Sequence, residues 1–236
     1  LGIGPGHRVL EIGTGWGGVA LHASQRRGAH VTTTTISREQ HAWAADRFAK
    51  SAAPERVELL FQDYRDLVGT YDRLVSIEMI EAVGHEYLDG YLRTCSDRLA
   101  HDGAMSIQAI VIGDQGYEAA HLHLDFIKQD IFPGGCLPSI ARIADGVASE
   151  TDLRICALED ITAHYAETLR RWRARFDAAE PELRALGCDD AFLRTWRYYL
   201  SYCEAGFEER HIGCVQMDLV KPGWRPQGPL STPSAG

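Results

Sequence analysis

A glycine-rich loop follows a short apolar segment near the start of the chain, in the sequence Val9-Leu10-Glu11-Ile12-Gly13-Thr14-Gly15-Trp16-Gly17-Gly18. Glycine adopts backbone conformations that other residues avoid, so such a loop can turn tightly and let a ligand approach the main chain. The apolar run before it is typical of a buried parallel strand, and a helix is expected to begin around Val19. A strand, a glycine loop and a helix in this order predict a nucleotide-binding α/β unit.

The glycines satisfy the dinucleotide pattern G-x-G-x-x-G, but the surrounding residues favour a different cofactor. Dinucleotide enzymes carry an acid at the end of the second strand that binds the ribose hydroxyls. The second strand expected here ends at Thr35 without an acid. The positive charge of Arg38 could pair with the 2′-phosphate of NADP, so charge alone does not exclude that cofactor. Glu11 lies inside the first strand and gives the pattern E-x-G-x-G. This pattern favours S-adenosylmethionine (SAM), which has no pyrophosphate to bind at the helix N-terminus.

Strands and helices alternate along the first half of the chain. Strands are expected at residues 9–12, 30–35, 57–61, 72–77, 104–110, 153–158 and 213–220, and helices at about 19–25, 37–50 and 85–99. This alternation predicts an α/β protein with a Rossmann-like methyltransferase fold, in which a mostly parallel seven-stranded sheet is doubly wound.

The alternation breaks after Gly113, and two apolar stripes at helical spacing follow. They consist of Ile161, Tyr165, Leu169, Trp172 and Phe176, and of Phe192, Trp196, Tyr199, Leu200, Cys203 and Phe207. We expect one domain over residues 1–221, with helical insertions at about 113–150 and 160–207 that cap the carboxyl ends of the strands, where ligands bind in such sheets. Residues 222–236 are rich in Pro, Gly and Ser and are predicted to form a flexible tail.

Composition limits the classes of function. Of the 236 residues, 45% are hydrophobic and 24% charged, as in globular proteins, and the net charge of −9 argues against a general nucleic-acid binder. The six cysteines include no C-x-x-C pair, which predicts reduced thiols and no metal site. No apolar run approaches the ~20 residues that span a bilayer, and the start does not match a signal peptide, so a cytoplasmic protein is expected.

Several stretches, in order along the chain, resemble the cyclopropane-fatty-acid synthase family of SAM-dependent methyltransferases. They are residues 11–18, 35–40, 63–67, 78–85, 126–139, 164–165 and 199–207. The most specific stretch is Ile131-Phe-Pro-Gly-Gly-Cys-Leu-Pro-Ser139, which a generic methyltransferase does not carry. Ala82 and Gln108 resemble the branch that includes plant-type cyclopropane synthases.

The resemblance implies transfer of the SAM methyl group to a cis double bond of a phospholipid acyl chain, followed by proton loss and closure of a cyclopropane ring. It implies a bound bicarbonate ion that takes the proton, a location at the inner face of the membrane, and compatibility with a homodimer. Family members also carry an N-terminal segment that this sequence does not include. The alternatives are a methyl-branching fatty-acid methyltransferase, a sterol or small-molecule C-methyltransferase, and a truncated, inactive SAM-binding module.

The resemblance also assigns residues to the cofactor. The methionine part of SAM is assigned to Gly13 and Gly15, the ribose to Thr35 and Gln40, and the adenine side to Asp63 and Tyr64. Without the resemblance, Thr35 would be interpreted as an ordinary strand residue and Asp63 as an ordinary loop acid.

Four residues match the catalytic positions of the family: Glu81, Gln108, Tyr165 and Cys203. Glu81 is expected to help bind bicarbonate, and Glu78 is the competing acid. Gln108 stands where many bacterial members carry a His, and its amide can donate a hydrogen bond but cannot become cationic. Tyr165 is expected to donate its phenol proton to bicarbonate. Cys203 matches a cysteine near the active site, although nothing beside it in the sequence marks an activated thiolate.

Overall fold

The computed structural model describes residues 1–225, so residues 226–236 of the predicted flexible tail lie outside the described part. A seven-stranded sheet has the order β3-β2-β1-β4-β5-β7-β6. Its strands are β1 (Arg8–Ile12), β2 (His30–Thr35), β3 (Val57–Phe61), β4 (Tyr71–Ile77), β5 (Leu99–Ile112), β6 (Arg154–Asp160) and β7 (Ile212–Val220). The first five strands pair in parallel, whereas β7 runs antiparallel to both β5 and β6. The predicted α/β fold with a mostly parallel seven-stranded sheet is confirmed.

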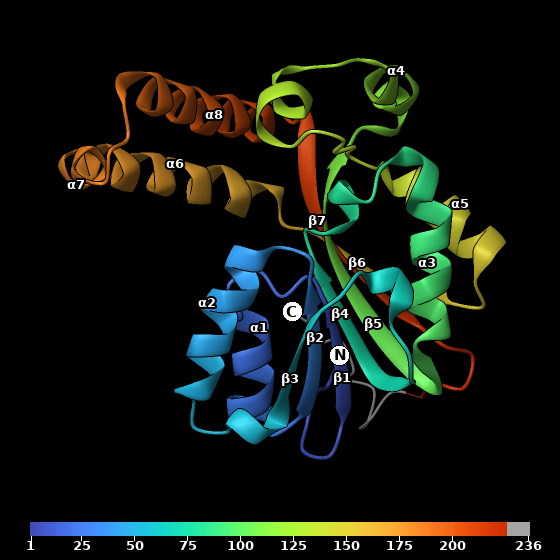
Figure 1. Ribbon diagram of the computed structural model, residues 1–236. Helices are drawn as coiled ribbons and strands as arrows, with labels where there is room; N and C mark the ends of the chain where they lie inside the picture. The colour runs from blue at the N-terminus through green and yellow to red at the C-terminus, as the bar shows by residue number, and fades with distance from the viewer. Residues whose placement is uncertain (226–236) are drawn as a thin grey trace, which may run out of the picture.

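Helices cover both faces of this sheet (Figure 1). One face packs against α1 (Gly18–Leu21) and α2 (Arg38–Ala49), and the other against α3 (Leu88–Asp97) and α5 (Ile140–Glu150). The strands between these two layers are apolar because both of their faces are covered: Val9, Leu10 and Ile12 of β1 are almost completely buried.

The segment after β5 contains an α/β element that the sequence did not predict. Within the stretch expected as an insertion at 113–150, α5 forms the crossover between β5 and β6 and packs against α3 through Ile143 and Val147. Ser139 caps this helix by accepting a hydrogen bond from the Arg142 N–H at 3.1 Å. A serine followed by apolar residues at helical spacing is a start signal that could have identified α5.

Three helices are inserted between β6 and β7: α6 (Thr162–Ala178), α7 (Glu180–Ala185) and α8 (Asp190–Glu208). Helices α6 and α8 lie side by side and project beyond the end of the sheet, at the same end as α4 (Tyr117–Leu122) (Figure 1). The strands β4 and β5 both end there, so residues at their carboxyl ends face this helical layer. Within residues 1–225, no helix has both the length and the apolar character needed to cross a lipid bilayer.

Candidate active site

The glycine loop after β1 has a backbone that only glycine adopts easily. Gly13, Gly15 and Gly17 have φ angles of 97°, 51° and 80°. The N–H groups of Gly13 and Thr14 donate to the Thr34 carbonyl at 3.1 and 3.0 Å, which fixes the loop to β2. A Cβ atom added at Gly15 would meet no atom of the chain within 4 Å. The loop is therefore held rigidly from inside the sheet and is open at Gly15.

Glu11 supports this loop from inside the protein. Glu11 is only 2% exposed, and its carboxylate accepts a hydrogen bond from the Thr33 hydroxyl at 2.6 Å. The Thr33 hydroxyl lies 2.7 Å from the Thr14 hydroxyl in the loop. Burial raises the pKa of Glu11 to about 7, and the Thr33 hydrogen bond opposes part of this effect. Glu11 is thus linked to the loop through the hydroxyls of Thr33 and Thr14.

The two residues assigned to the ribose lie in contact with each other. The Thr35 hydroxyl donates to Gln40 Oε1 at 2.9 Å and accepts from the Ser37 N–H at 3.1 Å. This arrangement fixes the Gln40 amide so that its nitrogen can point away from the pair. A hydroxyl-bearing ligand at the end of β2 could accept a hydrogen bond from that nitrogen, and the ribose role stays a prediction.

The two residues assigned to the adenine side follow β3, beside the end of β2. The Gln62 N–H donates to the Thr35 carbonyl at 3.2 Å, so the two loops are adjacent. Both carboxylate oxygens of Asp63 are paired with the Arg65 guanidinium, at 2.9 and 2.8 Å, and this pairing lowers the pKa of Asp63. Tyr64 packs edge-on against Tyr91, with ring centroids 5.5 Å apart. To bind adenine, Asp63 would have to share these oxygens with Arg65.

Glu78 is the centre of a polar network at the end of β4. Its carboxylate oxygen Oε1 accepts a hydrogen bond from Gln108 Nε2 at 2.6 Å and another from the Tyr165 hydroxyl. Gln216 Nε2 in turn donates to Gln108 Oε1 at 2.9 Å. The network joins β4, β5, β7 and α6. Of the four predicted catalytic residues, Gln108 and Tyr165 both bind Glu78. Glu78 is the acid that was expected only as the competitor of Glu81.

The backbone of Glu78 is unusual, and it lies beside the glycine loop. Its φ angle of 51° is in the left-handed region, which non-glycine residues rarely adopt and which is often found at functional sites. The next residue, Met79, lies 3.3 Å from the point where a Cβ at Gly13 would be. The half-buried carboxylate is therefore one residue away from the loop that is predicted to bind the cofactor.

Glu81 lies in the turn Ile80–Ala82 and makes a separate set of contacts. Its Oε1 accepts the Ile110 N–H at 2.5 Å, and its carbonyl accepts the Cys136 N–H at 2.8 Å. Its other oxygen, Oε2, is buried and has no hydrogen-bond partner among residues 1–225. Burial raises the pKa of Glu81 to about 7, against the opposing effect of the Ile110 N–H. Glu81 therefore connects β5 to the loop that contains Cys136.

An apolar cluster surrounds the network on the side of α6 and α8. Tyr165 packs against Phe207 with ring centroids 4.7 Å apart, and Cys203 and Tyr199 belong to the same cluster. Burial raises the pKa of Cys203 to about 11 and that of Tyr199 to about 12, and it raises the pKa of Tyr165 well above its usual range. The thiol and both phenols are therefore neutral at neutral pH. Cys203 contributes an apolar surface and not a thiolate nucleophile.

The donors of this site do not fit a bicarbonate ion. Gln108 Nε2 and the Tyr165 hydroxyl were expected to donate to bicarbonate, and both donate to the Glu78 carboxylate. Glu81 has one free oxygen, but a carboxylate repels another anion unless it holds a proton. A carboxylate of the chain itself thus occupies the donors that the resemblance assigns to bicarbonate.

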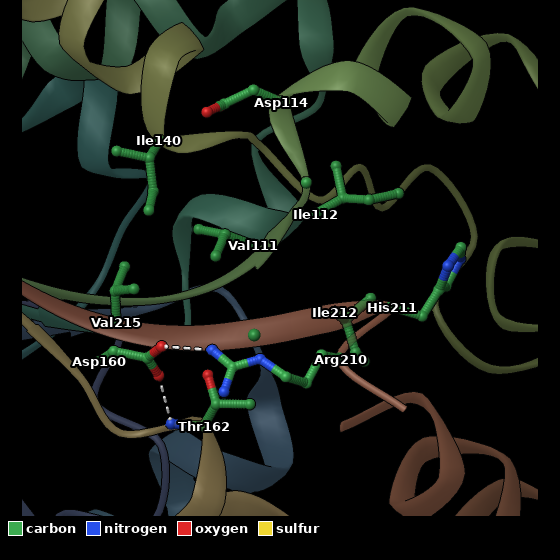
Figure 2. A pocket seen from close by; sticks show the side chains of 12 residues that line it. Val111, Ile112, Asp114, Ile140, Asp160, Thr162, Arg210, His211, Ile212 and Val215 are labelled. Atoms are coloured by element: carbon green, nitrogen blue, oxygen red, sulfur yellow. Dashed lines mark hydrogen bonds and ion pairs between the residues drawn. The ribbon is translucent and has the colours of Figure 1, made fainter. Parts of the chain in front are cut away.

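A separate pocket of about 160 Å³ lies where β5 and β6 end and β7 begins. Figure 2 shows Asp160 on one side of it, accepting hydrogen bonds from the Thr162 N–H at 2.8 Å and from Arg210 at 3.2 Å. On the other side, Asp114 accepts from the Ala141 N–H at 2.9 Å. Both carboxylates stabilise the first turns of helices, α6 and α5 respectively. None of the residues predicted for the active site lines this pocket.

Comparison with known proteins identifies relatives over nearly the whole chain. The family model described as mycolic acid cyclopropane synthetase matches residues 1–217. The chain is 41% identical to the tuberculostearic acid methyltransferase UfaA1 of Mycobacterium tuberculosis over 94% of its own length and 52% of that protein. It is 37% identical to the cyclopropane-fatty-acyl-phospholipid synthase of Escherichia coli K12 over 90% of its length and 53% of that protein. The chain thus spans about half the length of these curated relatives.

A solved structure has the same fold. The mycolic acid cyclopropane synthase CmaA1, complexed with SAH and CTAB, superimposes with a TM-score of 0.86 at 27% sequence identity. The match covers 94% of this chain and 80% of the CmaA1 chain. The sheet and the helical layer over its end are therefore a methyltransferase fold.

Proposed function

The chain belongs to the mycolic acid cyclopropane synthetase family, and we propose that it transfers the methyl group of SAM to a carbon–carbon double bond of an unsaturated acyl lipid. The observation that carries this proposal is the carboxylate network of Glu78, Gln108 and Tyr165, which is linked to the glycine loop by Met79, the residue that follows Glu78 and packs against Gly13. A methyl transfer to an alkene creates a carbocation, so the site needs apolar surroundings, aromatic faces and negative charge close to the transferred carbon.

The cofactor side of the proposal rests on the loops after β1, β2 and β3. SAM supplies an electrophilic methyl group on a positively charged sulfur when it is bound. The open backbone at Gly15 leaves room for the proposed approach of the methionine part, and the Thr35 hydroxyl holds the Gln40 oxygen, which leaves the Gln40 nitrogen available for the proposed ribose contact. The loop of Asp63 and Tyr64 lies next to the end of β2 and is the proposed adenine side.

The substrate side rests on the cluster beneath α6 and α8. Neutral Tyr165 and Tyr199 offer aromatic faces, and Ile110, Ile212 and Cys203 exclude water around them. A positive charge is stabilised by such faces and by the nearby carboxylate of the network. An acyl chain fits this environment better than a polar substrate, which would lose hydrogen bonds to water there.

An exposed apolar surface supports a membrane lipid as the source of the acyl chain. Large apolar or aromatic side chains are exposed around α4 and on α8: Leu122, Leu124, Phe132, Tyr198 and Tyr202. Phe126 joins the two elements by packing against Tyr198, with ring centroids 4.7 Å apart, and Phe132 packs against Tyr199 of the inner cluster. Exposed tyrosines and leucines suit a membrane interface, so we propose that this surface contacts phospholipid.

Two products are compatible with the same transfer. Loss of a proton from the transferred methyl group closes a cyclopropane ring, which is the product we propose first. Alternatively, a 1,2-hydride shift moves the cation to the methyl-bearing carbon, and loss of a proton from the transferred methyl group then gives a methylene branch. The similarity to a tuberculostearic acid methyltransferase favours this second candidate, together with Gln108 at a position where many bacterial cyclopropane synthases carry a His.

The test is lipid mass spectrometry after expression of the full-length protein in a host that lacks its own synthase. We expect unsaturated acyl chains to gain the mass of one CH₂, and proton NMR to distinguish ring protons at high field from methylene protons. A Gly15→Val variant serves as the inactive control, because a side chain at a φ of 51° strains the loop and blocks the backbone approach of SAM. Unchanged lipids together with tight NADPH binding and silent SAM in calorimetry would refute the proposal.

A further inference from the structure

We propose that the Glu78 carboxylate accepts the proton in this reaction, in the position that the resemblance gives to a bicarbonate ion. This inference rests on the proposed function and adds the identity of the base. Its starting observation is that the donors expected to bind the ion, Gln108 and Tyr165, are both hydrogen-bonded to one oxygen of Glu78.

The geometry leaves the second oxygen of Glu78 available for the reaction. Both donors contact Oε1, and among residues 1–225 no hydrogen bond reaches Oε2. Oε2 is also absent from the buried atoms without a partner, so it keeps some exposed surface. A carboxylate with one oxygen fixed and the other free is oriented as a positioned general base.

The other titratable groups of the site are less suited to accept a proton. Tyr165 is already a donor to Glu78, and Tyr199 and Cys203 are neutral in their apolar surroundings. Glu81 is held by the Ile110 N–H, and its burial favours the protonated carboxyl, which cannot act as a base. Glu78 is therefore the acceptor that the geometry selects.

The step balances without any further reactant. The π electrons of the alkene form the new bond to the methyl carbon, and the sulfur keeps the electron pair of the broken S–CH₃ bond, which yields S-adenosylhomocysteine. The adjacent chain carbon becomes cationic. Oε2 of Glu78 then takes a proton from the transferred methyl group, and the released C–H electron pair closes the ring. If a 1,2-hydride shift first moves the cation to the methyl-bearing carbon, the same proton loss forms the methylene double bond instead. Glu78 returns its proton to water after the product leaves.

The decisive variant is Glu78→Gly, because glycine accepts a φ angle of 51° without strain and opens space beside Gln108 and Tyr165. Arg210→Gly is the matched control, since Arg210 is the other non-glycine residue with a positive φ among residues 1–225, at 55°, and it lies outside the network. Turnover of the full-length protein is measured as release of S-adenosylhomocysteine, in buffer depleted of bicarbonate and in buffer with added bicarbonate or formate.

We expect the wild type and Arg210→Gly to be equally active with and without bicarbonate. Glu78→Gly should lose about 100-fold or more in turnover at unchanged SAM affinity. Added bicarbonate or formate should raise the turnover of this variant about tenfold. Loss of wild-type activity on removing bicarbonate would overturn the inference. Near-normal turnover of Glu78→Gly without an added anion would do the same.

A binding experiment tests the inference without relying on activity. Titration of ¹³C-bicarbonate followed by NMR should detect binding to Glu78→Gly that is about tenfold tighter than binding to the wild type, because the carboxylate repels a second anion. Equal binding to both proteins contradicts the inference. If the wild type methylates no unsaturated lipid, the proposed function fails, and the bicarbonate titration still decides whether Glu78 occupies the anion position.

Discussion

Replacement of Glu11 by glutamine should make the stability of this protein less dependent on pH. The carboxyl is buried beneath the glycine loop, and burial raises its pKa from the usual 4.5 to about 7. Between these two values the folded protein holds a proton at Glu11 that the unfolded chain has released. The free energy of unfolding therefore falls as the pH rises through this window, and above pH 7 the folded protein carries a buried charge.

The magnitude follows from the two pKa values. A window from 4.5 to about 7, at about 1.4 kcal/mol per pH unit, corresponds to about 3 kcal/mol of lost stability. Glutamine keeps an acceptor oxygen for the Thr33 hydroxyl but has no charge to bury. Glu11→Gln should thus be close to the wild type in stability near pH 4.5, and it should be more stable by about 3 kcal/mol at pH 8.

Urea unfolding of both proteins at several pH values between 4.5 and 8 measures this difference. Glu58→Gln is the matched control, because Glu58 also accepts a hydrogen bond from a threonine hydroxyl, that of Thr32 at 3.0 Å, but is exposed on β3. The control should follow the wild type at every pH. A constant difference between Glu11→Gln and the wild type, or a Glu11→Gln variant that is less stable at pH 8, would refute the reasoning.

Three further substitutions test the loop and the network. Gly17→Ala would bring a Cβ to 2.7 Å from the Phe48 ring at a φ of 80°, so urea unfolding should report a loss of about 2–3 kcal/mol in stability. Gly18→Ala is the control: its Cβ meets no atom within 4 Å, and it should cost less than about 0.5 kcal/mol. Glu81→Gln keeps an acceptor oxygen for the Ile110 N–H and should change turnover by less than about threefold, whereas a loss of about 100-fold would give Glu81 a direct part in the reaction. Gln108→Leu removes one donor to the central carboxylate and should lower kcat about tenfold; an unchanged kcat would contradict its positioning role.

The sequence alone determined the architecture because local signals agree with the tertiary arrangement. The apolar run before Gly13 is long enough for a buried strand, and the alternation of strands and helices leads to a parallel sheet wherever both faces must be covered. The tight turn at the loop could be predicted from its glycines, because the positive φ angles there disfavour any side chain. Helix α5 was missed because the whole stretch after Gly113 was assigned to an insertion, although Ser139 and the apolar residues that follow it mark a helix start.

The centre of the candidate site was decided only by the tertiary structure. Glu78 and Glu81 are both acids after the same strand, and nothing in their spacing tells which one faces Gln108. The left-handed backbone at Glu78 and the insertion of α6 bring Tyr165 onto its carboxylate from 87 positions along the chain. Glu81 is directed instead to the Ile110 N–H. The periodicity of apolar residues in a sequence predicts a strand or a helix. The partner of a buried carboxylate depends instead on how distant elements pack, and this packing exists only in the folded chain.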